Sequence, residues 1–149
     1  MRQEPGWVLV ADGQRARVLE RPSLGAPWEE LEAEAWKVFD PPSRSLGTDR
    51  PGRVHESLGT TRHALEPRHD PHEARKVAFA SDLAHRLEAA AEARRFARLI
   101  LVAPPAFLGH LRDALGDGTR QRLKGSLDLD LTKATLAEIV AHLPEHRPA

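Results

Sequence analysis

Arginine side chains in one long polar segment are the residues of this chain best suited to binding chemistry. Between Asp40 and Pro71, five arginines are interspersed with three histidines and with Pro, Gly, Ser and Thr, without a helix or strand period. Guanidinium groups make two-point contacts with phosphates, and a glycine lets a backbone approach a nucleic-acid strand closely. The candidate residues for binding RNA or another partner are Arg44, Asp49, Arg50, Pro51, Gly52, Arg53, Arg62 and Arg68.

The same residues also fit a purely structural role. Five acidic residues bring the net charge of the segment to about zero, and the segment has no aromatic side chain on which a base could stack. Asp49 could pair with Arg50 or Arg53 and so shape a turn. A segment of this length without regular structure in a compact domain is either functional or disordered.

A second group of polar side chains has the ligand types of a divalent-metal site. It comprises His63, His69 and His72, with Glu66 and Asp70. His69 and His72 straddle the expected start of a helix, and Asp70 is needed there as its cap. We therefore expect ordinary solvated histidines. Neither a metal nor a small-molecule cofactor is expected.

Asp12 ends the first apolar run and is a candidate carboxylate for phosphodiester cleavage by two metal ions. That reaction needs further carboxylates from neighbouring elements. The later apolar run ends in Ala103-Pro104-Pro105 and supplies none. Asp12 is therefore interpreted as a turn residue, and we expect no enzymatic activity.

Hydrophobic periodicity predicts the elements that must position these residues. The predicted strands are 7–11, 15–20, 98–103 and 123–129, with an Asp12-Gly13 turn between the first two. The predicted helices are 70–95, 107–115 and a last helix that is capped by Asp130 or Thr132 and ends near Leu143.

The longest predicted helix has the clearest start signal. Asp70 is its expected N-cap, Pro71 its first residue, and Glu73 the partner that closes a capping box. Its core face is expected to hold Val77, Ala80, Leu83, Ala84, Leu87 and Ala91. Gly116 is the expected stop of the helix that follows.

Residues 28–39 fit two structures. Trp28, Leu31, Ala35 and Phe39 have the spacing of a helix face. Leu31, Ala33 and Ala35 instead alternate with glutamates, as in a half-exposed strand. Composition favours the helix.

Five short motifs give the chain a family resemblance. They are Trp7-Val8-Leu9-Val10-Ala11-Asp12-Gly13, Asp49-Arg50-Pro51-Gly52-Arg53, Ala103-Pro104-Pro105, Leu108-Gly109-His110-Leu111-Arg112 and Asp130-Leu131-Thr132. In this order they resemble the bacterial host attachment protein family, which is similar to the middle domain of archaeal and eukaryotic peptide-chain release factors. The resemblance implies one α/β domain over residues 1–149, with a mixed sheet in ribonuclease-H-like order (βββαβαβα). It also implies a third antiparallel strand at 28–39 and a long loop at about 40–71.

The resemblance bears on activity as well. In release factors the corresponding loop carries Gly-Gly-Gln, which helps water attack the peptidyl-tRNA ester. This chain has Asp49 to Arg53 there, where Pro51 lacks a backbone donor and Arg53 cannot orient a water as an amide does. We therefore expect a binding protein that does not hydrolyse peptidyl-tRNA.

Composition limits the remaining function classes. The chain has 149 residues, a formal net charge of zero and no cysteine, which excludes disulfides and thiolate catalysis. No apolar run approaches the length of a membrane helix, so we expect a cytoplasmic protein without a membrane partner. The absence of Asn and scarcity of Gln fit a thermophile, although a GC-rich genome would favour the same composition.

The expected function is a non-catalytic binding module that contacts the ribosome or tRNA through its arginine-containing loop. Self-association is a further expected interaction. Two alternatives stay open: a role in attachment to host cells, as the family name states, and weak hydrolysis of an ester or phosphodiester.

The first prediction separates phosphate contact from turn formation. Replacing Arg50 and Arg53 together by Ala should weaken RNA association and lower its log-log salt slope by about two, with the free energy of unfolding unchanged. If the arginines only pair with Asp49, the double variant will bind RNA like the parent. Its melting temperature will then fall, as it will for Asp49→Ala.

Overall fold

The computed structural model describes residues 4–37 and 71–144 of the chain. The strands are β1 (Gly6–Ala11), β2 (Arg15–Arg21), β3 (Glu29–Glu30), β4 (Trp36–Lys37), β6 (Arg98–Val102) and β7 (Leu123–Leu127). The helices are α3 (Pro71–Glu92), α4 (Pro105–Ala114), α5 (Asp117–Arg122) and α6 (Leu136–His142), with a 3₁₀ turn η1 (Glu32–Glu34). In this part of the chain, none of the helices is long and apolar enough to cross a membrane.

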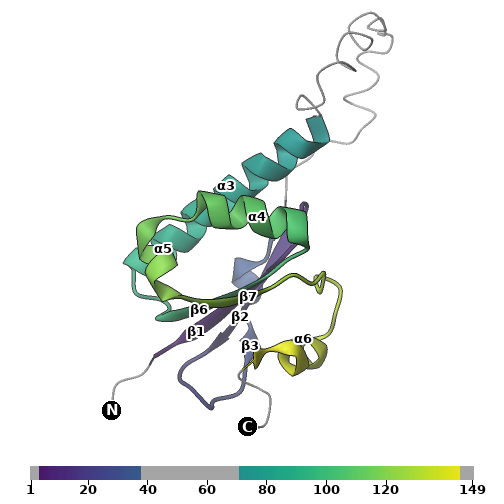
Figure 1. The fold of residues 1–149 in the computed structure, drawn as a ribbon. Coiled ribbons are helices and arrows are strands. Elements are labelled where there is room, and N and C mark those ends of the chain that lie inside the picture. Colours follow the sequence, from purple (N-terminus) through teal and green to yellow (C-terminus); the bar gives the residue numbers. More distant parts are fainter. Residues whose placement is uncertain (1–3, 38–70, 145–149) are drawn as a thin grey trace, which may run out of the picture.

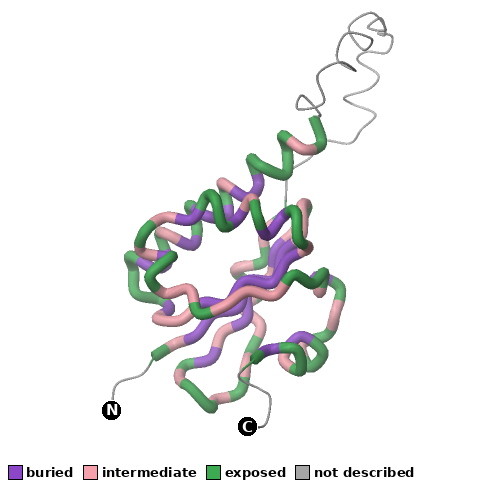
Figure 2. Tube along the Cα trace, viewed as in Figure 1, coloured by how far each residue is buried: buried purple, intermediate pink, exposed green. Residues whose placement is uncertain are grey.

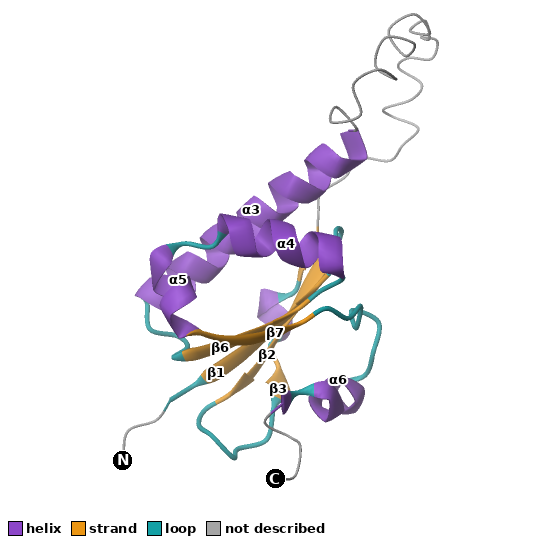
Figure 3. Cartoon of the chain, in the orientation of Figure 1, coloured by secondary structure: helices purple, strands orange, loops and turns teal. Residues whose placement is uncertain are grey.

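The strands form one mixed sheet in the order β3-β2-β1-β6-β7, and β4 also pairs with β2. β1 is antiparallel to β2 and parallel to β6, and β7 lies parallel on the far side of β6. Figures 1 and 3 show α3, α4 and α5 on one side of the sheet and α6 on the other. The predicted α/β class with a mixed sheet is confirmed.

Strand β1 is buried at all of its positions, on both faces of the sheet. Trp7 and Leu9 belong to the core beneath α3 and α4, whereas Val8 and Val10 belong to the core beneath α6. Figure 2 shows the resulting buried band along the middle of the sheet. Full burial of a Val or Leu side chain contributes about 1.5–3 kcal/mol, so the sheet requires a helical layer on each face.

Residues 29–37 form an interrupted strand along β2. Glu29 and Glu30 pair with Glu20 and Leu19, and Trp36 and Lys37 pair with Ala16 and Arg15. Between them η1 closes on itself through the N–H of Glu34, which donates to the carbonyl of Leu31 at 3.0 Å. The strand implied by the resemblance is therefore confirmed at 29–30 and 36–37 and is wrong at 32–34, which form the 3₁₀ turn. The alternative prediction, a helix, is wrong for the described part of this segment.

Helix α3 starts at Pro71, as predicted, while its expected cap Asp70 lies outside the described residues. Glu73 accepts a hydrogen bond from Nε2 of His110 in α4, at 2.5 Å. Val77 was expected in the core but is 46% exposed. Figure 1 gives the reason, because the first turns of α3 extend beyond the edge of the sheet.

Gly116 was predicted only as the stop of the preceding helix. It is also the N-cap residue of an additional helix, α5. The carboxylate of Glu88 in α3 caps this helix, accepting hydrogen bonds from Thr119 Oγ1 at 2.7 Å and from the backbone N–H of Thr119 at 2.9 Å. These bonds lower the pKa of Glu88. A Cβ at Gly116 would lie 2.7 Å from the Glu88 carboxylate, so a larger residue there would displace this cap.

Helix α6 is capped by Thr135 in a capping box with Glu138, rather than by the predicted Asp130 or Thr132. The helix starts later because the preceding turn is fastened to β2. Arg17 pairs with Glu30 at 2.7 Å and donates to the carbonyls of Thr132 at 2.9 Å and Ala134 at 2.7 Å. This arginine lowers the pKa of Glu30 through its hydrogen bond.

The second prediction concerns the cap of α5. Because the pKa of Glu88 is lower in the folded chain, its carboxylate stabilises the fold above the ordinary glutamate pKa of about 4.3. That contribution is lost as the pH falls through the folded-state pKa. Glu88→Gln should therefore lower the free energy of unfolding by about 1 kcal/mol at pH 7.

The effect of Glu88→Gln should shrink as the pH falls below about 4, since the parent carboxyl is then protonated as well. Urea unfolding at a series of pH values measures both quantities. Glu92→Gln, an exposed change on the same helix, is the control and should have little effect. An equal loss of stability at pH 3 and pH 7 for Glu88→Gln would contradict the capping role.

Candidate functional site

Most candidate residues from the sequence fall where the structure is not described. The residues outside the described ranges are Arg44, Asp49, Arg50, Pro51, Gly52, Arg53, Arg62, Arg68, His63 and His69. His72 is described and lies in the first turn of α3. Among residues 4–37 and 71–144, no three potential metal ligands lie together.

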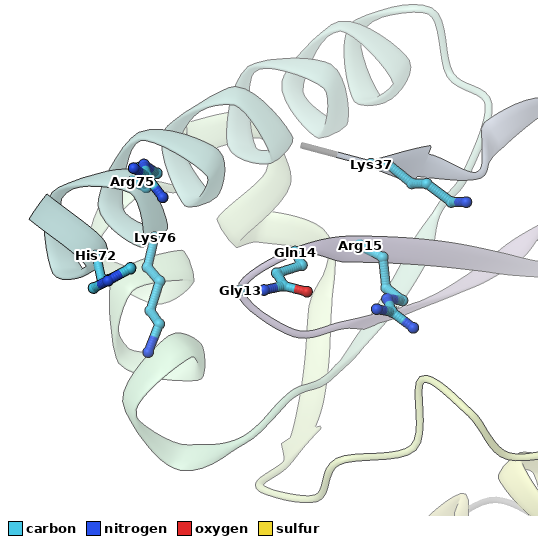
Figure 4. A pocket seen from close by; sticks show the side chains of 7 residues that line it. All are labelled: Gly13, Gln14, Arg15, Lys37, His72, Arg75 and Lys76. Atoms are coloured by element: carbon cyan, nitrogen blue, oxygen red, sulfur yellow. The ribbon is translucent and has the colours of Figure 1, made fainter. Parts of the chain in front are cut away.

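A cationic pocket of about 330 Å³ opens where α3 begins beside the β1–β2 turn (Figure 4). Its lining residues are Gly13, Gln14, Arg15, Lys37, His72, Arg75 and Lys76. Four of these side chains are cations at neutral pH, and the lining residues within 4–37 and 71–144 include no carboxylate. The chain as a whole carries no net charge, so this concentration of positive charge is local.

The turn that forms one wall of the pocket is shaped by Asp12. Its Oδ1 accepts hydrogen bonds from the backbone N–H of Gln14 at 2.8 Å and of Arg15 at 3.0 Å. Its Oδ2 accepts one from the hydroxyl of Thr132 at 3.0 Å. These contacts confirm the interpretation of Asp12 as a turn residue.

The pairing of β2 with β4 brings the positive charges of Arg15 and Lys37 close together. They lie directly opposite each other on β2 and β4. Directly paired residues of neighbouring strands have their side chains on the same face of the sheet. Within the described residues, no ion pair compensates either cation. Like charges opposite each other repel, and a bound anion would remove this cost.

The opposite wall comes from the first two turns of α3. His72, Arg75 and Lys76 are spaced so that they share one side of the helix. Lys76 passes close to the turn, because a Cβ at Gly13 would lie 3.0 Å from its Cγ. The amino end of a helix adds a partial positive charge to this wall.

Two carboxylates of the described structure that lie near the pocket, those of Glu73 and Asp12, make their hydrogen bonds elsewhere. Glu73 lies in the same turn of α3 as His72 but hydrogen-bonds His110 of α4. Asp12 is occupied by the turn and by Thr132. The side chains that line the pocket are therefore suited to hold an anionic group such as a phosphate.

Sequence reasoning identified only His72 among the residues that line this pocket. The spacing of His72, Arg75 and Lys76 is a basic helical pattern and could have been recognised. The meeting of Arg15 with Lys37 could not, because it depends on the pairing of β2 with the short strand β4.

A second hollow, of about 600 Å³, lies between the β2–β3 connection and α6. Its lining is mainly apolar, and its one charged side chain, Arg21, stacks on the ring of Trp28 at 4.6 Å. It brings no group of polar side chains together. The cationic pocket is thus the better candidate site.

Comparison with known proteins identifies the family. A search of curated proteins found no match. One family model matches residues 7–143, and its description is "Protein required for attachment to host cells". This match spans well over half of the chain and confirms the resemblance based on the five motifs. The chain therefore belongs to the family of proteins required for attachment to host cells.

Proposed function

We propose that this protein is a binding module that holds a polyanion, RNA in the first place, in its cationic pocket. The observation that carries the proposal is the pocket lining, which among the described residues has four cationic side chains and a histidine but no carboxylate. A volume of about 330 Å³ accommodates one nucleotide unit, near the lower limit of ordinary ligand pockets. The proposal does not include catalysis, and the absence of enzymatic activity stays a prediction.

The lining favours contact with a nucleic-acid backbone rather than with bases. None of its side chains is aromatic, so bases have no surface on which to stack. Lysine and arginine instead contact phosphates, which makes binding independent of sequence and sensitive to salt. We therefore expect little preference among RNA sequences.

The connectivity of the chain supports a role for the arginine-containing segment in the same site. Lys37 precedes this segment and His72 follows it, and both line the cationic pocket. The segment thus leaves and re-enters the described structure at the pocket. The segment carries five arginines together with five acidic residues, and its contact with RNA stays a prediction. The motif-based similarity to the release-factor middle domain, with its ribonuclease-H-like order, makes ribosomes and tRNA the first RNAs to test.

The family description favours a second candidate function, a role in attachment to host cells. A cationic pocket also suits sulfated or phosphorylated polymers on cell surfaces, which are polyanions like RNA. In this case the protein would bind an immobilised sulfated glycan such as heparin but not ribosomes or tRNA at the same salt concentration.

The third prediction tests the pocket itself. Replacing Arg15 and Lys76 together by Ala should weaken association with tRNA and ribosomes and lower the salt slope by about two. Fluorescence anisotropy with labelled tRNA, and co-sedimentation with ribosomes at low and high salt, measure this effect. The melting temperature should change little, since the two side chains make no recorded ion pair in the described structure.

Arg112→Ala with Lys133→Ala is the matched control, because both residues are exposed, lie outside the pocket lining and carry the same total charge. An equal loss in both double variants would indicate unspecific attraction and contradict a pocket. Loss of heparin binding alone, without any tRNA or ribosome binding by the parent, would favour attachment.

A further inference from the structure

Strand β7 is the outer strand of the sheet in the part of the chain that the structure describes. Figure 3 shows it at the margin of the sheet, paired on one side with β6. The N–H of Ala103 donates to the carbonyl of Leu127 at 3.1 Å, so the backbone groups of Leu127 face β6. Alternate residues of a strand direct these groups to opposite sides. The backbone N–H and C=O of Ser126 therefore point away from β6, towards the open side of the strand.

The opposite margin of the sheet is closed to strand addition. There the chain forms two strands of two residues each, β3 and β4, separated by the turn η1. This margin also carries Glu29 and Glu32, whose negative charges would repel the same margin of a second copy. Short, interrupted and charged edge strands are the usual protection against pairing. Among the described strands, β7 is thus the open edge.

The sequence of this open edge is complementary to itself. Lys124 and Asp128 lie at equal distances on either side of Ser126, and both are exposed. Asp128 lies one residue beyond the end of β7, so antiparallel pairing of two copies about Ser126 brings Lys124 of each copy near Asp128 of the other. Opposite charges on directly facing residues stabilise a strand pair.

We propose that two copies of this chain associate by antiparallel pairing of their β7 strands about Ser126. The pairing continues one sheet across a two-fold axis, as in other closed dimers. It gives the backbone N–H and C=O of Ser126 partners in the second copy. Lys124 and Asp128 form two identical ion pairs that fix the register.

The contact is short, so the dimer is weak. Leu123 pairs with Leu99 and Gly125 with Ile100, which leaves Lys124 as the extra residue of a bulge. Regular pairing is therefore confined to a few residues around Ser126. Such a contact buries less than the roughly 1,200 Å² of a stable interface, and we expect a dissociation constant on the order of 100 µM.

Sedimentation equilibrium of the full chain from 10 µM to 1 mM at low salt tests the dimer. Lys124→Asp and Asp128→Lys should each weaken association by roughly tenfold, because each change places like charges opposite one another at both pairs. An equimolar mixture of the two variants should associate again, since both facing pairs are then of opposite charge. Lys133→Asp, an exposed change outside β7, should leave association unaltered.

Thermal unfolding of each variant checks that the chain remains folded. Restored association on mixing can come only from pairing between copies, so it supports the proposal even if one variant is less stable. A parent chain that is monomeric at 1 mM would overturn the proposal. So would a dimer that both charge reversals leave intact, or a mixture that associates no better than its components.

Discussion

The burial of β1 on both faces is the constraint on which the rest of the structure depends. An apolar strand with no face for water must have neighbours on both sides and a helical layer above and below. The parallel strand β6 and the antiparallel strand β2 supply the neighbours. Helices α3 and α4 cover Trp7 and Leu9, and α6 covers Val8 and Val10. The carboxyl end of this strand then fixes where the Asp12 turn, and with it the cationic pocket, must lie.

The sequence was sufficient for elements whose signals are local. The apolar runs 7–11 and 98–103 were predicted as strands and the Asp12-Gly13 pair as a turn, and the structure confirms these elements to within one residue. Residues 28–37 were ambiguous because alternating glutamates fit a helix and a strand equally well, and the chain there mixes a strand with a 3₁₀ turn. Helix α5 was missed because its cap, Glu88, comes from a different helix. The residues around α5 alone give no indication of a cap that comes from a distant part of the sequence.

The candidate site shows the same division between local and tertiary information. The basic pattern of α3 is visible in the sequence, but the pocket also needs Arg15 and Lys37, which only the pairing of β2 with β4 brings together. Immediately before Lys37 the chain carries the glutamates of β3 and η1. Acidic and basic surfaces thus lie next to each other on a chain without net charge. A local basic surface of this kind would orient the proposed polyanion without attracting it to the whole molecule.

The contacts of Arg17 have a consequence for the order in which the chain can fold during synthesis. Arg17 binds the carbonyl of Ala134, 117 residues later in the sequence. At about 5–20 residues per second, that carbonyl is synthesised roughly 6 to 23 seconds after the arginine. Until then the strand face that carries Val8 and Val10 has no cover, because α6 follows Ala134. The nascent chain therefore cannot cover the side of β1 that carries Val8 and Val10 until almost all of its residues have been synthesised.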